Sequence, residues 1–178
     1  IRSAAPGAQI GIASTGKLCY PHTPADEEAA RNETFRLSDA DWMFTHTITL
    51  DAVCLGRVTV APGALCACMQ TVTQEEWSTI HAVPDFIGVN SYNGSEIAAG
   101  ADGRPVYLPR PRGFPCTALK WPVTPEIMEY GYAFLYERYQ LPLYVTECGL
   151  SCNDRIYLDG QVHDADRIDF LHRYLLAL

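Results

Sequence analysis

A carboxylate stands at the end of an apolar run in the sequence LPLYVTECGLS. Glu147 follows the run Leu141 to Val145 and Thr146, and a cysteine and a glycine come next. A carboxylate at a strand end can act as a general base, a general acid or a nucleophile. A polar strand end without any chemistry is the commoner case, so Glu147 needs suitable neighbours to be catalytic.

Three further residues could be those neighbours. Asn90 and Tyr92 end the apolar run of DFIGVNSYNG, and Trp121 follows a loop. A phenol beside a carboxylate can donate a hydrogen bond that keeps the carboxylate ionised and fixes its rotamer. The amide of Asn90 can bond a substrate hydroxyl. The indole of Trp121 can stack on a sugar ring, although an aromatic residue that only anchors its loop is an equally good interpretation.

The cysteines and histidines form no motif for metal or redox chemistry. Cys66 and Cys68 have the wrong spacing for zinc and lack a second pair, and Cys148 and Cys152 are not a C-x-x-C pair. Cys148 would need a base to be a nucleophile, and no histidine partner is evident. The sequence also lacks a glycine-rich phosphate loop. We therefore predict no metal and no cofactor. The histidines, read as surface or packing residues, are His22, His46, His81, His163 and His172.

Three apolar runs are predicted to be strands that carry these side chains. They are Ala8–Thr15, the run Phe86–Val89 with its polar end, and Leu141–Gly149. Each run is nearly continuous in apolar residues, which is typical of strands buried on both faces of a parallel sheet. We therefore expect all three strands to be buried.

The segments between the strands are predicted to be mainly helical. Thr23 can cap a helix and Pro24 suits its first position, so one long or broken helix should run from about Pro24 to Leu50. Further helices are predicted over residues 73–83, 124–140 and 164–178. The stretch VAPGALCACMQTV is predicted to be irregular, and residues 100–115 a long exposed loop. Residues of the 124–140 helix that can share one face are Ile127, Met128, Gly131, Phe134, Leu135 and Tyr139.

The order strand, helix, strand, helix, strand, helix predicts an α/β fold with parallel strands covered by helices. Active sites of such sheets lie at the carboxyl ends of the strands. Glu147, Asn90 and Tyr92 should therefore gather at one edge of the sheet.

The composition limits the class of protein. The 178 residues suit one domain, and 48% apolar residues allow a sizeable core. A net charge of −8 without a Lys/Arg cluster argues against nucleic-acid binding. No apolar run is long enough to cross a membrane, and the first residues lack the build of a signal peptide. Seven scattered cysteines do not resemble a disulfide framework, so we expect reduced thiols and a cytoplasmic location.

Several stretches, in the right order, resemble glycoside hydrolase family 1, the β-glucosidase family. LPLYVTECGLS is similar to the Thr-Glu-Asn-Gly signature, and DFIGVNSYNG is similar to the strand DFLGxNYYT. KWPVTPEIMEYGYAFLYERYQ resembles the family stretch that runs from a tryptophan to this signature. LDGQVHDADRIDFLHRYL resembles the x-D-G-x-V-x-D-x-x-R-I-x-Y-L segment, and the first residues fit the fifth strand and its helix.

This resemblance implies a (β/α)8 barrel and a retaining β-glycosidase. It implies that Glu147 is the nucleophile and that Tyr92 hydrogen-bonds it. It places Asn90 near the sugar and Trp121 beside the aglycone. The implied ligand is a β-glucoside or a related sugar, and which sugar is left open.

The resemblance also implies that residues 1–178 are a single incomplete barrel domain, with about strands five to seven and their helices. The family acid/base lies in an Asn-Glu-Pro motif on the fourth strand, and this sequence has none. Asn32-Glu33 precedes Thr34 in a predicted helix and is no substitute. Cys148 also replaces the family asparagine after the nucleophile, and Ser91 replaces a common tyrosine. We therefore expect weak or no activity from the isolated chain, and partners in the rest of the barrel or in self-association.

Two other functions stay open. The chain could be a non-catalytic, oligomerising sugar-binding or interaction protein derived from this family. The second alternative function is thiol chemistry at Cys148, although the neighbouring carboxylate would raise the pKa of the thiol and lower its reactivity.

Overall fold

A computed structural model describes residues 1–60 and 62–178 of the chain. The described residues form two compact units. Unit 1 comprises Ile1–Lys17, Thr34–Asn90 and Leu135–Thr146. Unit 2 comprises Leu18–Glu33, Ser91–Phe134 and Glu147–Leu178.

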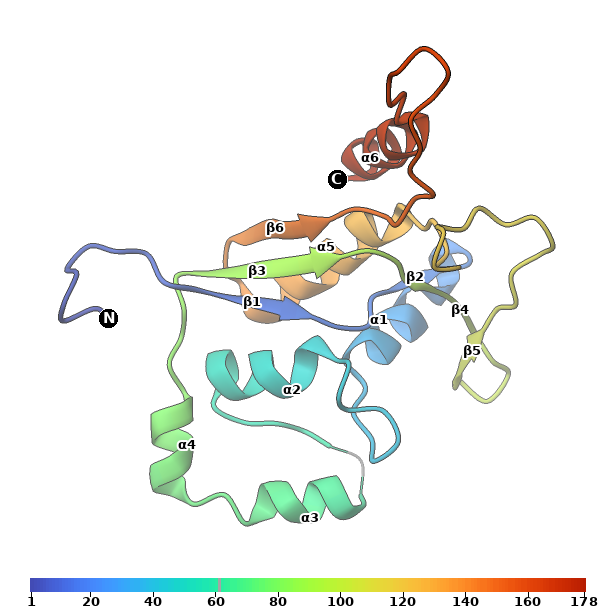
Figure 1. The fold of residues 1–178 in the computed structure, drawn as a ribbon. Coiled ribbons are helices and arrows are strands. Elements are labelled where there is room, and N and C mark those ends of the chain that lie inside the picture. The colour runs from blue at the N-terminus through green and yellow to red at the C-terminus, as the bar shows by residue number, and fades with distance from the viewer. Residues whose placement is uncertain (61) are drawn as a thin grey trace. The chain divides into compact units, whose positions relative to one another are not determined.

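The first sheet contains the three predicted strands in the order β1-β3-β6. They are β1 (Gly11–Thr15), β3 (Phe86–Ser91) and β6 (Leu143–Cys148). β1 and β3 pair in parallel, and the three arrows run the same way in Figure 1. The prediction of parallel strands is confirmed for β1 and β3.

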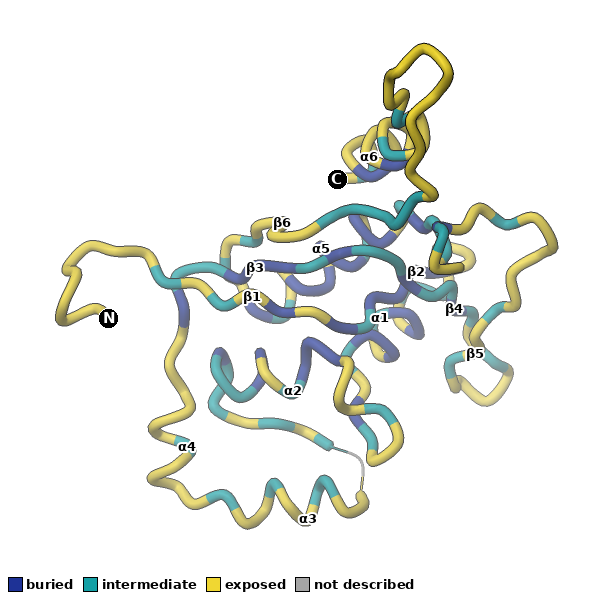
Figure 2. Tube along the Cα trace, in the orientation of Figure 1, coloured by how far each residue is buried: buried dark blue, intermediate teal, exposed yellow. Residues whose placement is uncertain are grey.

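The burial of this sheet differs from the prediction. Ile87 and Val89 of β3 are 0% exposed, but in β6 Tyr144 is 54% and Val145 is 38% exposed (Figure 2). Most of β1 is also exposed or half-buried. The expectation that all three strands are buried is therefore wrong for β1 and β6. The reason is their position, because both are edges of a three-stranded sheet and only β3 has a neighbour on each side.

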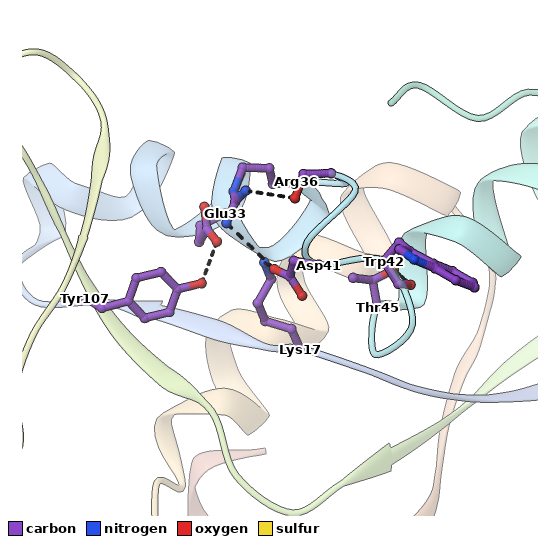
Figure 3. A network of polar contacts seen from close by, with 8 residues as sticks. Lys17, Glu33, Arg36, Asp41, Trp42, Thr45 and Tyr107 are labelled. Atoms are coloured by element: carbon purple, nitrogen blue, oxygen red, sulfur yellow. Dashed lines mark hydrogen bonds and ion pairs between the residues drawn. The ribbon is translucent and has the colours of Figure 1, made fainter. Parts of the chain in front are cut away.

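The helix predicted from Pro24 to Leu50 is broken. It consists of a 3₁₀ turn (Pro24–Asp26), α1 (Glu27–Phe35) and α2 (His46–Leu50), and a π-helical turn follows (Asp51–Leu55). In the non-helical part, Asp41 pairs with Lys17 at 2.7 Å (Figure 3). The Thr45 hydroxyl also donates to the carbonyl of Trp42 at 3.1 Å. These contacts within unit 1 favour a turn where local sequence suggested a helix.

A helix also occupies most of the stretch that was predicted to be irregular. α3 (Ala64–Gln70) begins where the carboxylate of Asp39 accepts hydrogen bonds from the backbone N–H groups of Ala64 and Leu65, both at 2.8 Å. These contacts satisfy two N–H groups that a helix start leaves open. The prediction failed because the capping residue lies 25 positions away. The predicted short helix is confirmed as α4 (Gln74–Ile80), with a capping box of Thr73 and Glu76.

Unit 2 contains a second sheet that the sequence patterns did not predict. Its strands are β2 (Cys19–Pro21), β4 (Ser95–Ala99) and β5 (Pro105–Tyr107). β2 pairs with β4 in parallel, and β4 pairs with β5 antiparallel. β5 therefore interrupts the loop predicted over residues 100–115. The hydroxyl of Tyr107 donates to the carboxylate of Glu33, which is 0% exposed (Figure 3).

Two further helices, α5 and α6, are long. α5 (Glu126–Tyr139) buries every residue of its predicted face, and that prediction is confirmed. α6 (Ala165–Ala177) buries Phe170 and Tyr174 and exposes most of its other apolar residues. Among the described residues, no helix combines the length and apolar character needed to cross a membrane.

Candidate active site

Glu147 and Tyr92 are hydrogen-bonded in unit 2. The hydroxyl of Tyr92 donates to Oε2 of Glu147, and Glu147 is exposed near the end of β6. This hydrogen bond holds the Glu147 side chain in one orientation. Tyr92 directly follows β3 along the chain. An exposed, oriented carboxylate is the geometry that a nucleophile or a general base needs.

Trp121 lies beside Tyr92 in the same unit. The centroids of the two rings are 5.8 Å apart with an interplanar angle of 58°, and 45% of Trp121 is exposed. A tight turn holds the loop, because Thr117 and Trp121 exchange hydrogen bonds. The Thr117 N–H donates to the Trp121 carbonyl at 2.8 Å, and the Trp121 N–H donates to Thr117 Oγ1 at 3.2 Å. The indole is thus fixed and accessible to a flat ligand surface.

Asn90 is placed by contacts within unit 1. It lies opposite Thr15 in the β1–β3 ladder, and its Oδ1 accepts a hydrogen bond from Thr146 Oγ1 at 2.7 Å. The contact with Thr146 fixes the rotamer of the Asn90 amide. The structure therefore brings Tyr92, Trp121 and Glu147 together in unit 2 and Asn90 with Thr146 in unit 1.

The segment that carries Tyr92 is held by residues that the sequence reasoning missed. The hydroxyl of Tyr174 donates to the carbonyl of Tyr92 at 2.8 Å, and the N–H of Gly94 donates to Thr124 Oγ1 at 2.8 Å. Tyr174 is a buried residue of α6, four positions after Phe170. No local signal identifies a tyrosine whose role depends on a carbonyl 82 residues away.

One acidic cluster in unit 2 has a partner already. Sγ of Cys152 and carboxylate oxygens of Asp154 and Asp164 lie within 4.8 Å of one another. The guanidinium of Arg167 donates to Asp154 at 2.7 Å and to Asp164 at 2.6 Å. The Arg167 charge therefore compensates both carboxylates, and we assign no metal to this cluster.

A cavity of about 460 Å³ lies elsewhere in unit 2. Its lining includes Lys120, Ser151, Phe170 and Arg173. Glu147, Tyr92 and Trp121 are not among its lining residues. The cavity is therefore separate from the hydrogen-bonded carboxylate.

The whole chain matches one family model, Glycosyl hydrolase family 1, over residues 1–178. Beta-glucosidase A of Thermotoga maritima is 32% identical over 103 residues, which cover 57% of this chain and 23% of that protein. The 6-phospho-beta-glucosidase of Dickeya chrysanthemi is 26% identical over 186 residues, which cover 97% of this chain and 38% of that protein.

Solved structures agree with the sequence matches. The beta-glucosidase from Thermotoga maritima in complex with castanospermine matches 99% of this chain with a TM-score of 0.72 at 24% identity. The match covers 38% of that structure, so this chain spans well under half the length of its relatives. Family 1 β-glucosidases are TIM barrels, and the described residues here form partial sheets and no closed barrel.

Proposed function

Since this chain belongs to glycosyl hydrolase family 1, we propose that it is the nucleophile-bearing part of a retaining β-glycosidase. The substrate class is a β-glucoside or a related sugar. The names of the relatives support this class, because they include β-glucosidases and a 6-phospho-beta-glucosidase. The observation that carries the proposal is the hydrogen bond from Tyr92 to the exposed carboxylate of Glu147.

In the proposed mechanism Glu147 attacks the anomeric carbon of the sugar and displaces the leaving group. A covalent glycosyl-enzyme forms, and water then hydrolyses it. The Tyr92 hydroxyl holds the Glu147 carboxylate in place before the attack and fixes the direction of approach. Trp121 stacks on the aglycone, and the Asn90 amide donates to a sugar hydroxyl.

A retaining glycosidase also needs a carboxyl acid/base about 5–5.5 Å from the nucleophile. The 178 residues contain no Asn-Glu-Pro sequence, and Glu33 is fully buried against Tyr107. We propose that the acid/base comes from outside these residues and that β1, β3 and β6 correspond to the fifth, sixth and seventh barrel strands. The isolated chain should therefore turn over ordinary alkyl or aryl glucosides weakly or not at all.

The open sheet supports a need for partners. β1 and β6 are its edges, and β6 exposes Tyr144 and Val145. Unpaired strand edges and exposed apolar side chains favour association. We propose the rest of the barrel or a second copy of this chain as the partner. A non-catalytic, oligomerising sugar-binding protein is the second candidate, and the same open edges favour it.

The test uses 2,4-dinitrophenyl 2-deoxy-2-fluoro-β-glucoside, whose leaving group departs without protonation. The first step therefore does not need the acid. Intact mass after incubation should show one added sugar, and peptide mapping should place it on Glu147. The 6-phosphate of the same reagent distinguishes the two substrate classes. The variant Glu147→Gln should not be labelled, whereas Glu129→Gln, which changes an exposed glutamate of α5, should be labelled like the wild type.

A folded wild-type chain that acquires no sugar from either reagent would remove the catalytic proposal. If light scattering then shows a defined oligomer that binds glucose reversibly, the non-catalytic function is supported. If labelling occurs but turnover does not, adding the missing acid-bearing part of a family 1 barrel should restore hydrolysis.

A further inference from the structure

The hydroxyl of Tyr174 joins two backbone segments of unit 2. It donates to the carbonyl of Tyr92 at 2.8 Å and accepts from the N–H of Thr124 at 3.0 Å. Tyr174 is 1% exposed and Thr124 is 0% exposed. A phenol has only one proton to donate. Tyr174 donates it to the backbone carbonyl of Tyr92, and the hydroxyl of Tyr92 in turn binds Glu147.

The position of the Tyr174 ring is itself fixed. The ring stacks on Phe170 with centroids 3.9 Å apart and an interplanar angle of 21°, and both rings are buried. Burial raises the pKa of Tyr174 to about 12, so the phenol keeps its proton at neutral pH. The donor therefore has a fixed position and a fixed protonation state.

We propose that Tyr174 is a positioning residue for the glycosidase reaction. It holds the backbone of Tyr92 so that the Tyr92 hydroxyl reaches Oε2 of Glu147. This inference rests on the proposed function and extends it to a helix residue that does not touch the substrate. The chain of contacts runs from Tyr174 through Tyr92 to Glu147.

Other contacts anchor the same segment on either side of Tyr92. The hydroxyls of Ser91 and Tyr132 are 2.9 Å apart, and the Gly94 N–H donates to Thr124 Oγ1 at 2.8 Å. These contacts hold the flanks in place, whereas the Tyr174 contact acts on the carbonyl of Tyr92 itself. Loss of the Tyr174 hydroxyl should therefore loosen the Tyr92 side chain while the surrounding fold persists.

The main variant is Tyr174→Phe, which removes the hydroxyl and keeps the stacked ring. A small displacement near reacting groups costs a large factor in rate, so the labelling rate constant of Glu147 should fall about 10-fold or more. The concentration of fluoroglucoside that gives half the maximal rate should change little, because Tyr174 does not contact the sugar. The matched control is Tyr139→Phe, which removes another buried hydroxyl whose acceptor is Asp51 in unit 1. It should leave the labelling rate nearly unchanged.

A second readout does not depend on activity. The chain is labelled with tyrosine carrying ¹³C at the ring carbon bonded to oxygen, and Tyr92→Phe assigns the Tyr92 resonance. Tyr174→Phe should shift or broaden this resonance because the phenol–carboxylate bond weakens. Tyr139→Phe should not. Together, a shifted Tyr92 resonance and slower labelling support the positioning role.

The outcomes separate the two proposals. If the wild type is labelled and Tyr174→Phe is labelled at the same rate with an unmoved Tyr92 resonance, the positioning role is wrong and the proposed function stands. If the wild type is not labelled but the Tyr92 resonance moves in Tyr174→Phe, the proposed function fails and the structural part of the inference stands. If Tyr174→Phe does not fold, an NMR measurement on the wild-type chain tests the positioning role instead. Its Tyr174 hydroxyl proton should exchange slowly and show a cross-peak to the Thr124 amide proton, which donates to the Tyr174 oxygen, and absence of that peak overturns the inference.

Discussion

The guanidinium of Arg138 donates two hydrogen bonds to the carboxylate of Asp51, at 2.8 and 2.5 Å. Only 2% of the Asp51 side chain is exposed, against 32% for Arg138. The Tyr139 hydroxyl donates a third bond to Asp51 at 2.8 Å. The ion pair of Arg138 and Asp51 connects the C-terminal end of α5 to the π-helical turn in unit 1. A buried carboxylate with three donors is costly to disturb, since each donor loses its acceptor with it.

Asp51→Asn should therefore destabilise the chain. Breaking a buried ion pair costs about 3 kcal/mol, because the remaining charge keeps its desolvation cost without its partner. Urea unfolding followed by circular dichroism should show a clearly lower midpoint. The control is Asp169→Asn in the exposed pair with Arg173, which should leave the midpoint almost unchanged. Equal midpoints for wild type and Asp51→Asn would mean that the Arg138 contact contributes nothing net.

The parts of the fold predicted from sequence are those set by local periodicity. The buried face of α5 follows from apolar spacing alone, and the start of α4 follows from the Thr73 and Glu76 capping box. The parallel pairing of β1 and β3 follows from two apolar runs separated by helical segments. In these places the local pattern and the tertiary environment favour the same structure.

The failures have tertiary causes. α3 depends on a distant cap from Asp39, and the short strands β2 and β5 have too few residues to show a period. The exposure of β6 depends on what lies beside it, which an apolar run cannot reveal. In the candidate site, the residue types of Glu147 and Tyr92 suggested their contact. The support from Tyr174 could not be predicted, since it is a contact to a backbone carbonyl and has no sequence pattern.

His46 should make stability fall in mildly acidic solution. It is 0% exposed, its Nδ1 lies 2.9 Å from Ser14 Oγ, and burial lowers its pKa to about 4. In the unfolded chain the pKa returns to about 6.5, so between pH 6.5 and 4 the unfolded state binds more protons than the folded state. Stability should therefore be lost as pH falls through this window, by about 3 kcal/mol in all.

The measurement is the free energy of unfolding against pH from 4 to 7. The slope in this window should be smaller in His46→Gln, which cannot be protonated there. The control His172→Gln changes an exposed histidine of α6 and should keep the wild-type slope. An NMR titration in which the His46 ring protons shift near pH 6.5 in the folded chain would contradict this expectation.

Cys148 should be a poor nucleophile despite its position next to Glu147. Burial raises the pKa of its thiol, so little thiolate is present at neutral pH. Cys116 is exposed and serves as the comparison within the same chain. At pH 7.5, iodoacetamide followed by peptide mapping should modify Cys116 well before Cys148. Preferential labelling of Cys148 would revive the thiol hypothesis.

Gly94 should be needed to hold Tyr92 in place. A Cβ at this position would lie 2.3 Å from Ile127 Cγ2 and 2.4 Å from the backbone oxygen of Leu18, so Gly94→Ala must displace the segment. Such overpacking typically costs 1–3 kcal/mol, and we expect about 2 kcal/mol here. The displaced segment should also weaken the Tyr92–Glu147 contact and slow labelling of Glu147 by the fluoroglucoside.

The control for this variant is Gly149→Ala, where an added Cβ would meet no atom within 4 Å. Urea unfolding should therefore show a lower midpoint for Gly94→Ala than for Gly149→Ala. If Gly94→Ala keeps the wild-type midpoint and the wild-type Tyr92 resonance, the segment accommodates the added methyl group without loss of stability. Tyr92 would then be held by its own contacts with Glu147 and Trp121 rather than by the backbone that precedes Gly94.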